Sequence, residues 1–410
     1  MHERSPRGIA IAGLLALAVA MGIGRFAFTP LLPMMLADGT IDLAGASWLA
    51  SANYAGHLIG ASICTFHPWL APRLGWPQAV NAPAVVRRGL AATAALAAAM
   101  YVPWPAAWPV LRFVAGIASA FVLVHATSWC MGQLARQGAA HVGAVMYAGP
   151  GAGIVASGLA ASAMVAAGWH ADAGWLGFGV IAALLTVAAW SSFDPALGKD
   201  GAARPATASA SGDDREHGTA EVALFAANYG ISGFGYIITA TFLPVIARAA
   251  LPGSPWLDMF WPIFGAAVVV GALAVSRLRG EGDMRKRLAV CFAIQSAGVA
   301  IGVLSPTLAG FAIGSILLGL PFTAITFFAT QEVRRLRPQH VSSYVGVITI
   351  SFGLGQIAGP PLAAALVARS GTPAEGFALS LWIAAAALAV GAVLYAVMPR
   401  VFGMRRVNPS

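Results

Sequence analysis

The feature that most constrains this chain is a series of apolar runs of about 20 residues or more, which recur along its whole length. A helical run of that length crosses the hydrocarbon core of a bilayer. Only 10% of the residues are charged, whereas a soluble domain carries about a quarter. The short alternating segments of a transmembrane barrel are not seen. The sequence therefore predicts an all-α polytopic membrane protein.

Twelve transmembrane helices are expected, with a break in the middle of the chain. Residues 194–220 are rich in Gly, Ala, Ser, Pro and charge, so we predict a flexible cytoplasmic linker there. It separates an N-terminal six-helix bundle, 1–193, from a C-terminal six-helix bundle, 221–410. The first run continues to about Leu36, which favours a span over a signal peptide. The spans lie near 9–36, 45–70, 88–104, 106–134, 140–168, 173–193, 221–248, 255–277, 287–305, 308–333, 341–368 and 375–398.

The basic residues indicate the orientation. With the N-terminus inside, 20 of the 24 Lys and Arg residues fall on the cytoplasmic side, and only Arg248 and Arg369 fall outside. The positive-inside rule therefore places both termini in the cytoplasm. It also explains the net charge of +9 without a nucleic-acid partner. We expect the protein to be embedded in the lipid bilayer. We also expect it to be a monomer.

Metal, cofactor and nucleotide sites are not expected. Cys64, Cys130 and Cys291 each lie inside an apolar run, where a free thiol behaves as a small hydrophobic group. No clustered Cys/His spacing points to a metal site. No GxxxxGK[ST] loop occurs, which argues against ATP as the driving force.

The two halves look related. Residues 22–33 and 233–244 occupy the same place in spans 1 and 7, and Arg25 of the first aligns with Tyr236 of the second. This similarity favours an internal duplication. The identical pairs are Gly22 with Gly233, Gly24 with Gly235, Leu32 with Leu243, and Pro33 with Pro244.

Four motifs carry a family resemblance: "GIGRFAFTPLLPMM" in span 1, "NYGISGFGYIITATFLPVIAR" in span 7, "GLPFTAIT" in span 10 and "SFGLGQIAGP" in span 11. Over nearly the whole chain, the sequence resembles the YbfB/YjiJ-like branch of the major facilitator superfamily (MFS). The resemblance implies two pseudo-symmetric six-helix bundles, a transporter that is not an enzyme, and the cytoplasmic (inner) membrane of a bacterium.

The chain departs from the superfamily in one loop. Between spans 2 and 3 the superfamily usually carries an acid and several arginines. Here the loop keeps Arg87 and Arg88 but lacks the acid, and "SRLRGEGDMRKR" between spans 8 and 9 is a looser echo of the pattern. The usual lock at the cytoplasmic gate is therefore not expected in full.

The resemblance implies that spans 1, 4, 7 and 10 line a central cavity. Polar side chains are concentrated in the inner spans, as expected for groups that avoid lipid. His57 and His125 are candidates for carrying a coupling proton. The substrate-binding candidates are Arg25, Asn53, Tyr54, His125, Asn228, Tyr236, Thr323 and Gln356. The gate or hinge candidates are Gly22, Gly24, Pro33, Arg112, Gly149, Pro150, Gly233, Gly235 and Pro244.

Arg25 is the most informative of these residues, because an ionised guanidinium inside a membrane is costly. No Asp or Glu lies deep in any span; Asp258 and Glu332 sit near span ends. One interpretation is that Arg25 meets an anionic group of the solute, since its planar fork suits a carboxylate or phosphate. The alternative is that Arg25 bonds helix-end carbonyls or side-chain oxygens and holds the two bundles together.

The sequence thus predicts a secondary active transporter for a small organic solute, with an anionic or zwitterionic solute favoured. The partial Gly149-Pro150 motif in span 5 resembles one common in antiporters, so efflux of drugs or metabolites is the alternative. A coupling proton or a counter-substrate is a possible second partner. A membrane-embedded enzyme would want clustered acids, histidines or nucleophiles near one membrane face, and no such cluster is evident.

Overall fold

The computed structural model describes residues 5–198, 218–251, 253–254, 256–278, 283–337 and 340–402, and all regular elements there are helices. Most of the predicted linker, 199–217, lies outside the described residues. The first half contains α1 (Pro6–Leu17), η1 (Ala18–Ile23), α2 (Phe28–Ala37), α3 (Leu43–Leu74), α4 (Ala82–Ala99), α5 (Trp108–Arg136), η2 (Ala140–Ala148), α6 (Gly149–Ala166), α7 (Ala171–Trp190), η3 (Ser191–Phe193) and η4 (Pro195–Gly198). The second half contains α8 (Thr219–Ala250), η5 (Leu257–Met259), α9 (Phe260–Val275), α10 (Met284–Leu304), α11 (Leu308–Gly319), α12 (Phe322–Leu336), α13 (Val341–Arg369) and α14 (Pro373–Val401).

Each predicted span corresponds to one helix or to consecutive helical segments. Within the described ranges, ten helices are long and apolar enough to cross a membrane. They confirm a multi-pass helical membrane protein. The helices α3 and α4 are not among the ten. The first carries polar residues such as Asn53 and His57, and the second has only 18 residues, two of them Arg87 and Arg88.

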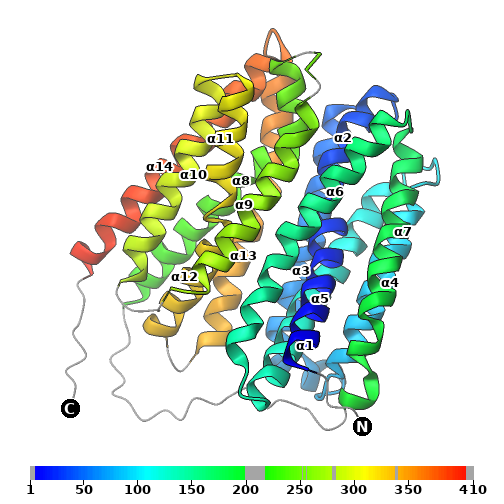
Figure 1. The fold of residues 1–410 in the computed structure, drawn as a ribbon. Helices are drawn as coiled ribbons and strands as arrows, with labels where there is room; N and C mark the ends of the chain where they lie inside the picture. Colours follow the sequence, from blue (N-terminus) through cyan, green and yellow to red (C-terminus); the bar gives the residue numbers. More distant parts are fainter. Residues whose placement is uncertain are drawn as a thin grey trace.

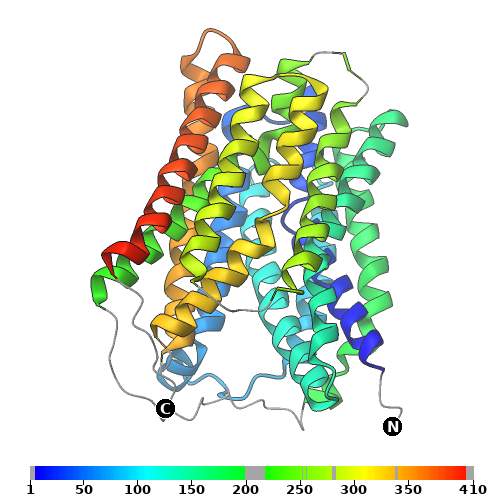
Figure 2. The ribbon, with the colours of Figure 1, turned by 60° about the vertical axis from the view of Figure 1, so that its left-hand side comes forward.

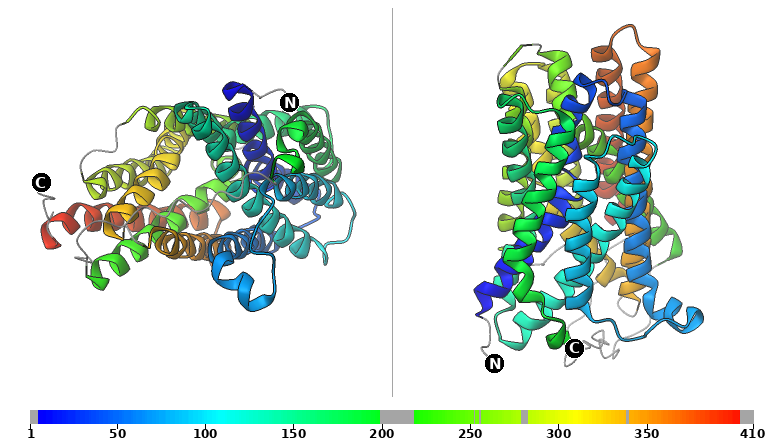
Figure 3. Two further views of the ribbon diagram at one scale, coloured as in Figure 1. Left: turned by 90° about the horizontal axis from the view of Figure 1, so that it is seen from below. Right: turned by 90° about the vertical axis from the view of Figure 1, so that its right-hand side faces the viewer.

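The helices of each half gather on one side of the molecule. Figure 1 shows the first half, blue to green, on the right and the second half, green-yellow to red, on the left. The view from below in Figure 3 shows the same separation. Helix α3 packs on α13, α6 on α9, and α2 on α8 across the boundary. In both Figure 1 and Figure 2, α1 begins and α14 ends toward the bottom, which we call the termini end; the other is the opposite end.

Small residues allow the closest helix contacts. A Cβ on Gly151 of α6 would lie 2.7 Å from the carbonyl oxygen of Gly265 on α9, so these backbones touch across the boundary between the halves. Within the first half, a Cβ on Gly22 would overlap the backbone of Gly153 on α6. Within the second half, a Cβ on Gly233 would overlap the Phe352 carbonyl on α13. Gly22 thus packs against span 5 of the chain and Gly233 against span 11. Span 11 is the fifth span of the second half, so the two contacts are equivalent.

Candidate functional site

The first span is interrupted at Arg25. The π-helix η1 ends at Ile23, residues 24–27 form turns, and α2 begins at Phe28. Pro30 explains the break, because it has no N–H for the Phe26 carbonyl. That carbonyl accepts from Thr29 N instead, 3.2 Å away. A broken helix with a π-turn is a recurring feature of transport sites, because it exposes backbone groups inside the protein.

Two side chains take up the carbonyls at this break. Arg112 of α5 donates to the carbonyl oxygens of Gly24, at 3.3 Å, and of Arg25, at 3.0 Å. Asn53 of α3 donates to the Gly24 carbonyl at 3.3 Å and to the Arg112 carbonyl at 2.8 Å. Both side chains are buried. Arg112 and Asn53 therefore stabilise the interrupted helix from within the first half. The hydrogen-bond acceptors of the charged Arg112 side chain are neutral carbonyls.

The Arg25 side chain crosses to the second half. Its NH2 donates to Oε1 of Gln356 on α13 at 2.5 Å, and the amide of Gln356 donates to the hydroxyl of Tyr236 on α8. The guanidinium also lies over the rings of Phe26 and Tyr54, 5.4 and 5.1 Å from their centroids. Arg25 is only 4% exposed. The structure thus brings four substrate-binding candidates together: Arg25, Tyr54, Tyr236 and Gln356.

No described carboxylate pairs with Arg25 or Arg112. The ion pairs in the described part of the chain involve His170, Arg248, Arg285 and Arg335 as their cationic partners. The Nε atoms of both Arg25 and Arg112 are buried, and neither has a hydrogen-bond partner among the described residues. Two guanidiniums therefore lie in the interior with neutral neighbours only, and their combined field favours an anion nearby.

Hydrogen bonds to carbonyls freed by proline join the halves toward the opposite end. Pro244 has no N–H for the Ala240 carbonyl, which accepts from the Thr29 hydroxyl at 2.7 Å. Pro361 likewise frees the Ile357 carbonyl, which accepts from the Ser51 hydroxyl at 3.0 Å. Tyr54 and Thr241 share a further hydroxyl contact across the boundary, at 2.9 Å. Pro244, a hinge candidate, thus exposes an acceptor that the other half uses.

We expect the double variant Thr29→Val with Ser51→Ala to open the opposite end. Each lost hydrogen bond is worth about 1 kcal/mol, so the pair shifts the equilibrium by about thirtyfold. Pulsed electron paramagnetic resonance between spin labels on the exposed residues Ala37 and Ala374 should then show longer distances. Thr349→Val is the control, since that hydroxyl bonds only within α13. An unchanged distance distribution in the double variant contradicts the prediction.

A cavity of about 430 Å³ lies between the halves toward the termini end. Met131, His141 and Tyr147 line it from the first half, and Thr323 and Arg334 from the second. Thr323 and Arg334 are eleven positions apart on α12, so the cavity extends roughly 16 Å along that helix. The substrate-binding candidate Thr323 marks its inner end.

Aromatic rings separate this cavity from Arg25. Phe322, next to Thr323, packs edge-on against Tyr236 with ring centroids 5.2 Å apart, and it also contacts Phe26 at 6.5 Å. Phe352 stacks on the Tyr236 ring, with the two ring centroids 5.7 Å apart. The Arg25–Gln356–Tyr236 contacts therefore lie just beyond the inner end of the cavity, behind Phe322.

The remaining substrate and proton candidates lie within single halves. His57 Nδ1 is 2.9 Å from the Ser119 hydroxyl, between α3 and α5. His125 faces Cys64 across the same pair of helices. Asn228 donates to the Gly391 carbonyl of α14 at 2.9 Å. These are interhelical contacts, and the proposed proton and substrate roles of these residues stay predictions.

The hinge candidates sit at close helix contacts. A Cβ on Gly24 would press on Thr93, and one on Gly235 would press on Leu388. Gly149 and Pro150 form the start of α6, where Gly149 touches the Leu14 carbonyl. Pro33 lies inside α2. Packing alone accounts for these contacts, and bending at these points stays a prediction.

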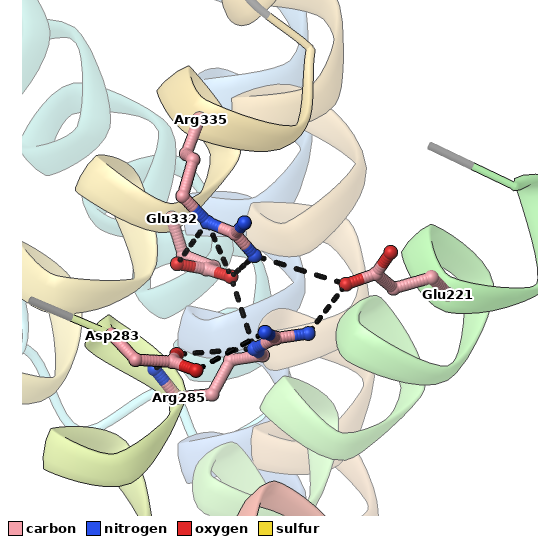
Figure 4. Close-up of polar contacts among 5 residues, drawn as sticks. All are labelled: Glu221, Asp283, Arg285, Glu332 and Arg335. Carbon is pink, nitrogen blue, oxygen red and sulfur yellow. Dashed lines mark hydrogen bonds and ion pairs between the residues drawn. The ribbon is translucent and has the colours of Figure 1, made fainter. Parts of the chain in front are cut away.

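The structure also contains a buried charge cluster that the sequence interpretation missed (Figure 4). Arg285 NH1 lies 2.6 Å from Glu221 Oε1 of α8, and both Arg285 Nε and NH2 lie 3.1 Å from Asp283. Glu332 of α12 lies 3.4 Å from Arg285 Nε and 2.5 Å from Arg335 NH2. The cluster sets three carboxylates against two guanidiniums. It ties the termini-end portions of α8, α10 and α12 together.

One sequence signal does point to this cluster. Asp283 and Arg285 belong to the loop between spans 8 and 9, whose acid and arginines loosely echo the superfamily pattern. In the sequence, Glu332 lies near a span end, and the structure shows it fully buried there. Glu221 begins the seventh span and is not among the candidate residues predicted from the sequence. From the sequence alone, an acidic residue at the end of a span is expected to contact water. Only the packing of α8 on α10 and α12 shows that this residue is enclosed.

A contact at the opposite end predicts a small pH dependence. Asp38 after α2 accepts from the backbone N of Ala171 at 2.7 Å and contacts His170 Nδ1 at 3.0 Å. The hydrogen bond and the charge of Asp38 raise the pKa of His170 above its usual value. This contribution to stability is present below the unfolded pKa and is lost as pH rises through the folded pKa.

We therefore expect the melting temperature of the wild type to fall between about pH 6 and 8 by more than that of Asp38→Asn. An asparagine oxygen still caps α7, so the variant removes the charge and keeps the cap. Differential scanning fluorimetry of purified protein across that range checks the prediction. Parallel pH profiles for the two proteins would contradict it.

Comparison with known proteins agrees with this architecture. A family model described as "Uncharacterised MFS-type transporter YbfB" matches residues 17–396. Among curated proteins, none matches the chain. Among solved structures, a crystal structure of a variant of the nucleoside transporter NupG is similar, with a TM-score of 0.69 and 15% identity over 95% of this chain and 99% of that one. At that identity the likeness concerns the fold.

The match to the family model covers most of the chain, and it agrees with the multi-pass helical fold and with a transporter as structural neighbour. These findings support a secondary transporter and not an enzyme. The chain belongs to the YbfB-like family of MFS-type transporters.

Proposed function

We propose that this protein is a secondary active transporter that moves a small anionic or zwitterionic organic solute by alternating access. Arg25 binds the anionic group of the solute. Twelve helices, α3 and α4 included, cross the cytoplasmic membrane of a bacterium as two six-helix bundles. The termini end faces the cytoplasm, in keeping with the basic side chains in the loops and helix ends there.

The observation that carries the substrate class is the uncompensated charge of Arg25. Arg25 is 4% exposed, and among the described residues the only side chain that accepts a hydrogen bond from it is the neutral amide of Gln356; such a guanidinium is costly to hold in a membrane interior. A carboxylate or phosphate of the solute would offset that cost, because it can accept two N–H bonds in parallel. The nearby Arg112 adds to the positive potential, which disfavours cationic solutes.

The arrangement of Arg25 also supports alternating access. It lies between a cavity toward the termini end and the hydrogen bonds that join the halves toward the opposite end. Gln356 accepts from the guanidinium and in turn donates to the hydroxyl of Tyr236. A solute entering past Phe322 would compete with Gln356 for Arg25 and so weaken one contact between the halves. Binding is thereby coupled to the movement of one half against the other.

Thermal stabilisation of the purified protein by ligands tests this function. The panel contains carboxylates, phosphorylated solutes, cations and neutral sugars, applied to the wild type, Arg25→Ala and Gln356→Ala. A ligand that binds the folded state raises the melting temperature. We expect anions to stabilise the wild type and Gln356→Ala but not Arg25→Ala. Stabilisation of all three proteins by cations or neutral solutes alone would overturn the proposed substrate class.

A further inference from the structure

A second hollow lies on the outer side of the first half, at the termini end. Its volume is about 650 Å³, and its walls include Trp76 and Val80 of the loop after α3, Arg87 and Arg88 of α4, and Trp190 of α7. None of these residues lines the cavity between the halves. We call it the α4–α7 groove. It plays no part in the transport path described above.

The groove is basic and has a positioned arginine. Arg87 Nε donates to the Trp190 carbonyl at 3.0 Å, and its guanidinium lies 4.8 Å from the centroid of the Trp190 ring. This bond uses Nε, and no other hydrogen bond in the described part of the chain engages the terminal nitrogens of Arg87. Arg88 is exposed beside it. Asp194 lies close by in the chain, but its carboxylate accepts from the backbone N of Ala196 at 3.0 Å.

An exposed apolar stripe leads along α7 into this groove. Val180, Leu184 and Val187 are 51%, 66% and 72% exposed, and Trp190 is 40% exposed. Their spacing of three or four residues places them on one face of the helix. Such a face is covered by hydrocarbon in a membrane protein. Trp76 and Trp190 are of the type that sits at the level of lipid headgroups.

These observations combine two chemistries at one place. A pair of arginines suits a phosphate, and the stripe above it suits an alkyl chain. A soluble anion would leave the stripe unused, and an acidic peptide would have to enter the membrane to reach it. We propose that the α4–α7 groove is a binding site for an anionic glycerophospholipid, with the phosphate between Arg87 and Arg88 and an acyl chain along Val180, Leu184 and Val187.

Native mass spectrometry and thermal stabilisation of the full-length protein in detergent test the site. The ligands are phosphatidylglycerol, phosphatidylcholine and inorganic phosphate. We expect phosphatidylglycerol alone to bind and stabilise the wild type. In Arg87→Gln with Arg88→Gln, its affinity should fall about thirtyfold, since each arginine near an anionic headgroup contributes about a factor of five.

A charge-matched control distinguishes a specific lipid-binding site from a general electrostatic attraction of anionic lipids to the basic end of the protein. Arg277→Gln with Arg400→Gln removes two exposed arginines from the same end of the molecule but from the other half, and it should bind phosphatidylglycerol as the wild type does. The single variant Arg88→Gln, at an exposed position, should fold normally and lose about fivefold. Equal losses in both double variants, or unchanged binding in the groove variants, would overturn the site. Equal stabilisation by inorganic phosphate would overturn the lipid as its ligand.

Discussion

Arg25→Ala should reduce transport of the solute into proteoliposomes by about a hundredfold or more, because two charge-assisted hydrogen bonds to an anionic group contribute about 3 kcal/mol. Arg25→Lys keeps the charge but loses the planar fork, so we expect an intermediate loss of about tenfold. Uptake of the ligand identified by thermal stabilisation is the measurement. The unliganded variants should still elute as folded protein in size-exclusion chromatography.

Gln356→Ala distinguishes the two interpretations of Arg25. It removes the contact between the halves from the other side and leaves the guanidinium in place. If Arg25 binds solute, Gln356→Ala retains most of the transport and binds the ligand as tightly or more tightly, since the amide no longer competes. If Arg25 only holds the halves together, the two variants lose activity alike, and the proposed substrate role fails.

Arg285→Ala should lower the free energy of unfolding by about 3–5 kcal/mol, because it leaves buried carboxylates without their central partner. Arg285 is fully buried and contacts Glu221, Asp283 and Glu332. Thermal or denaturant unfolding in detergent measures the loss. Lys286→Ala is the matched control, since that side chain is next in sequence and exposed, and it should change stability by less than about 0.5 kcal/mol.

A second substitution checks the cause of that loss. Glu332→Gln in the Arg285→Ala background removes one of the stranded charges, so the double variant should be more stable than the sum of the two single effects predicts. Additive effects would mean that Arg285 and Glu332 do not act on each other. The cluster joins α8, α10 and α12 near the termini end, so we expect these helices to move as one unit during transport.

The two halves differ at their termini ends. The first half keeps Arg87 and Arg88 but has no acid in the loop after α3, whereas the second half has Asp283 and Arg285 inside an ionic cluster. In the first half, Arg87 and Arg88 line the α4–α7 groove, and no acid of that loop pairs with them. The aligned glycines predict an internal duplication, and under that prediction two equivalent loops carry different side-chain chemistry.

Several features were predictable from local pattern alone. The length and hydropathy of the runs predict the helices, and the family resemblance is confirmed by the match over residues 17–396. Arg25, Tyr54, Tyr236, Gln356 and Thr323 stand out because a polar group in an apolar run is costly to expose to lipid. That argument identifies which side chains need partners, but it does not identify the partners.

By itself, the sequence determined that the chain is a multi-pass helical membrane protein of the YbfB-like family, because hydrophobic length and motifs are properties of contiguous residues. Only the tertiary structure decided that Arg25 meets Gln356, 331 positions away, that carbonyls freed by Pro244 and Pro361 join the halves, and that Glu221, Arg285 and Glu332 are enclosed together. These contacts depend on which helix faces are apposed. When helices are apolar on nearly all sides, hydropathy does not specify which faces pack together. Those faces are specified by close packing at small residues and by the need of buried polar groups for partners.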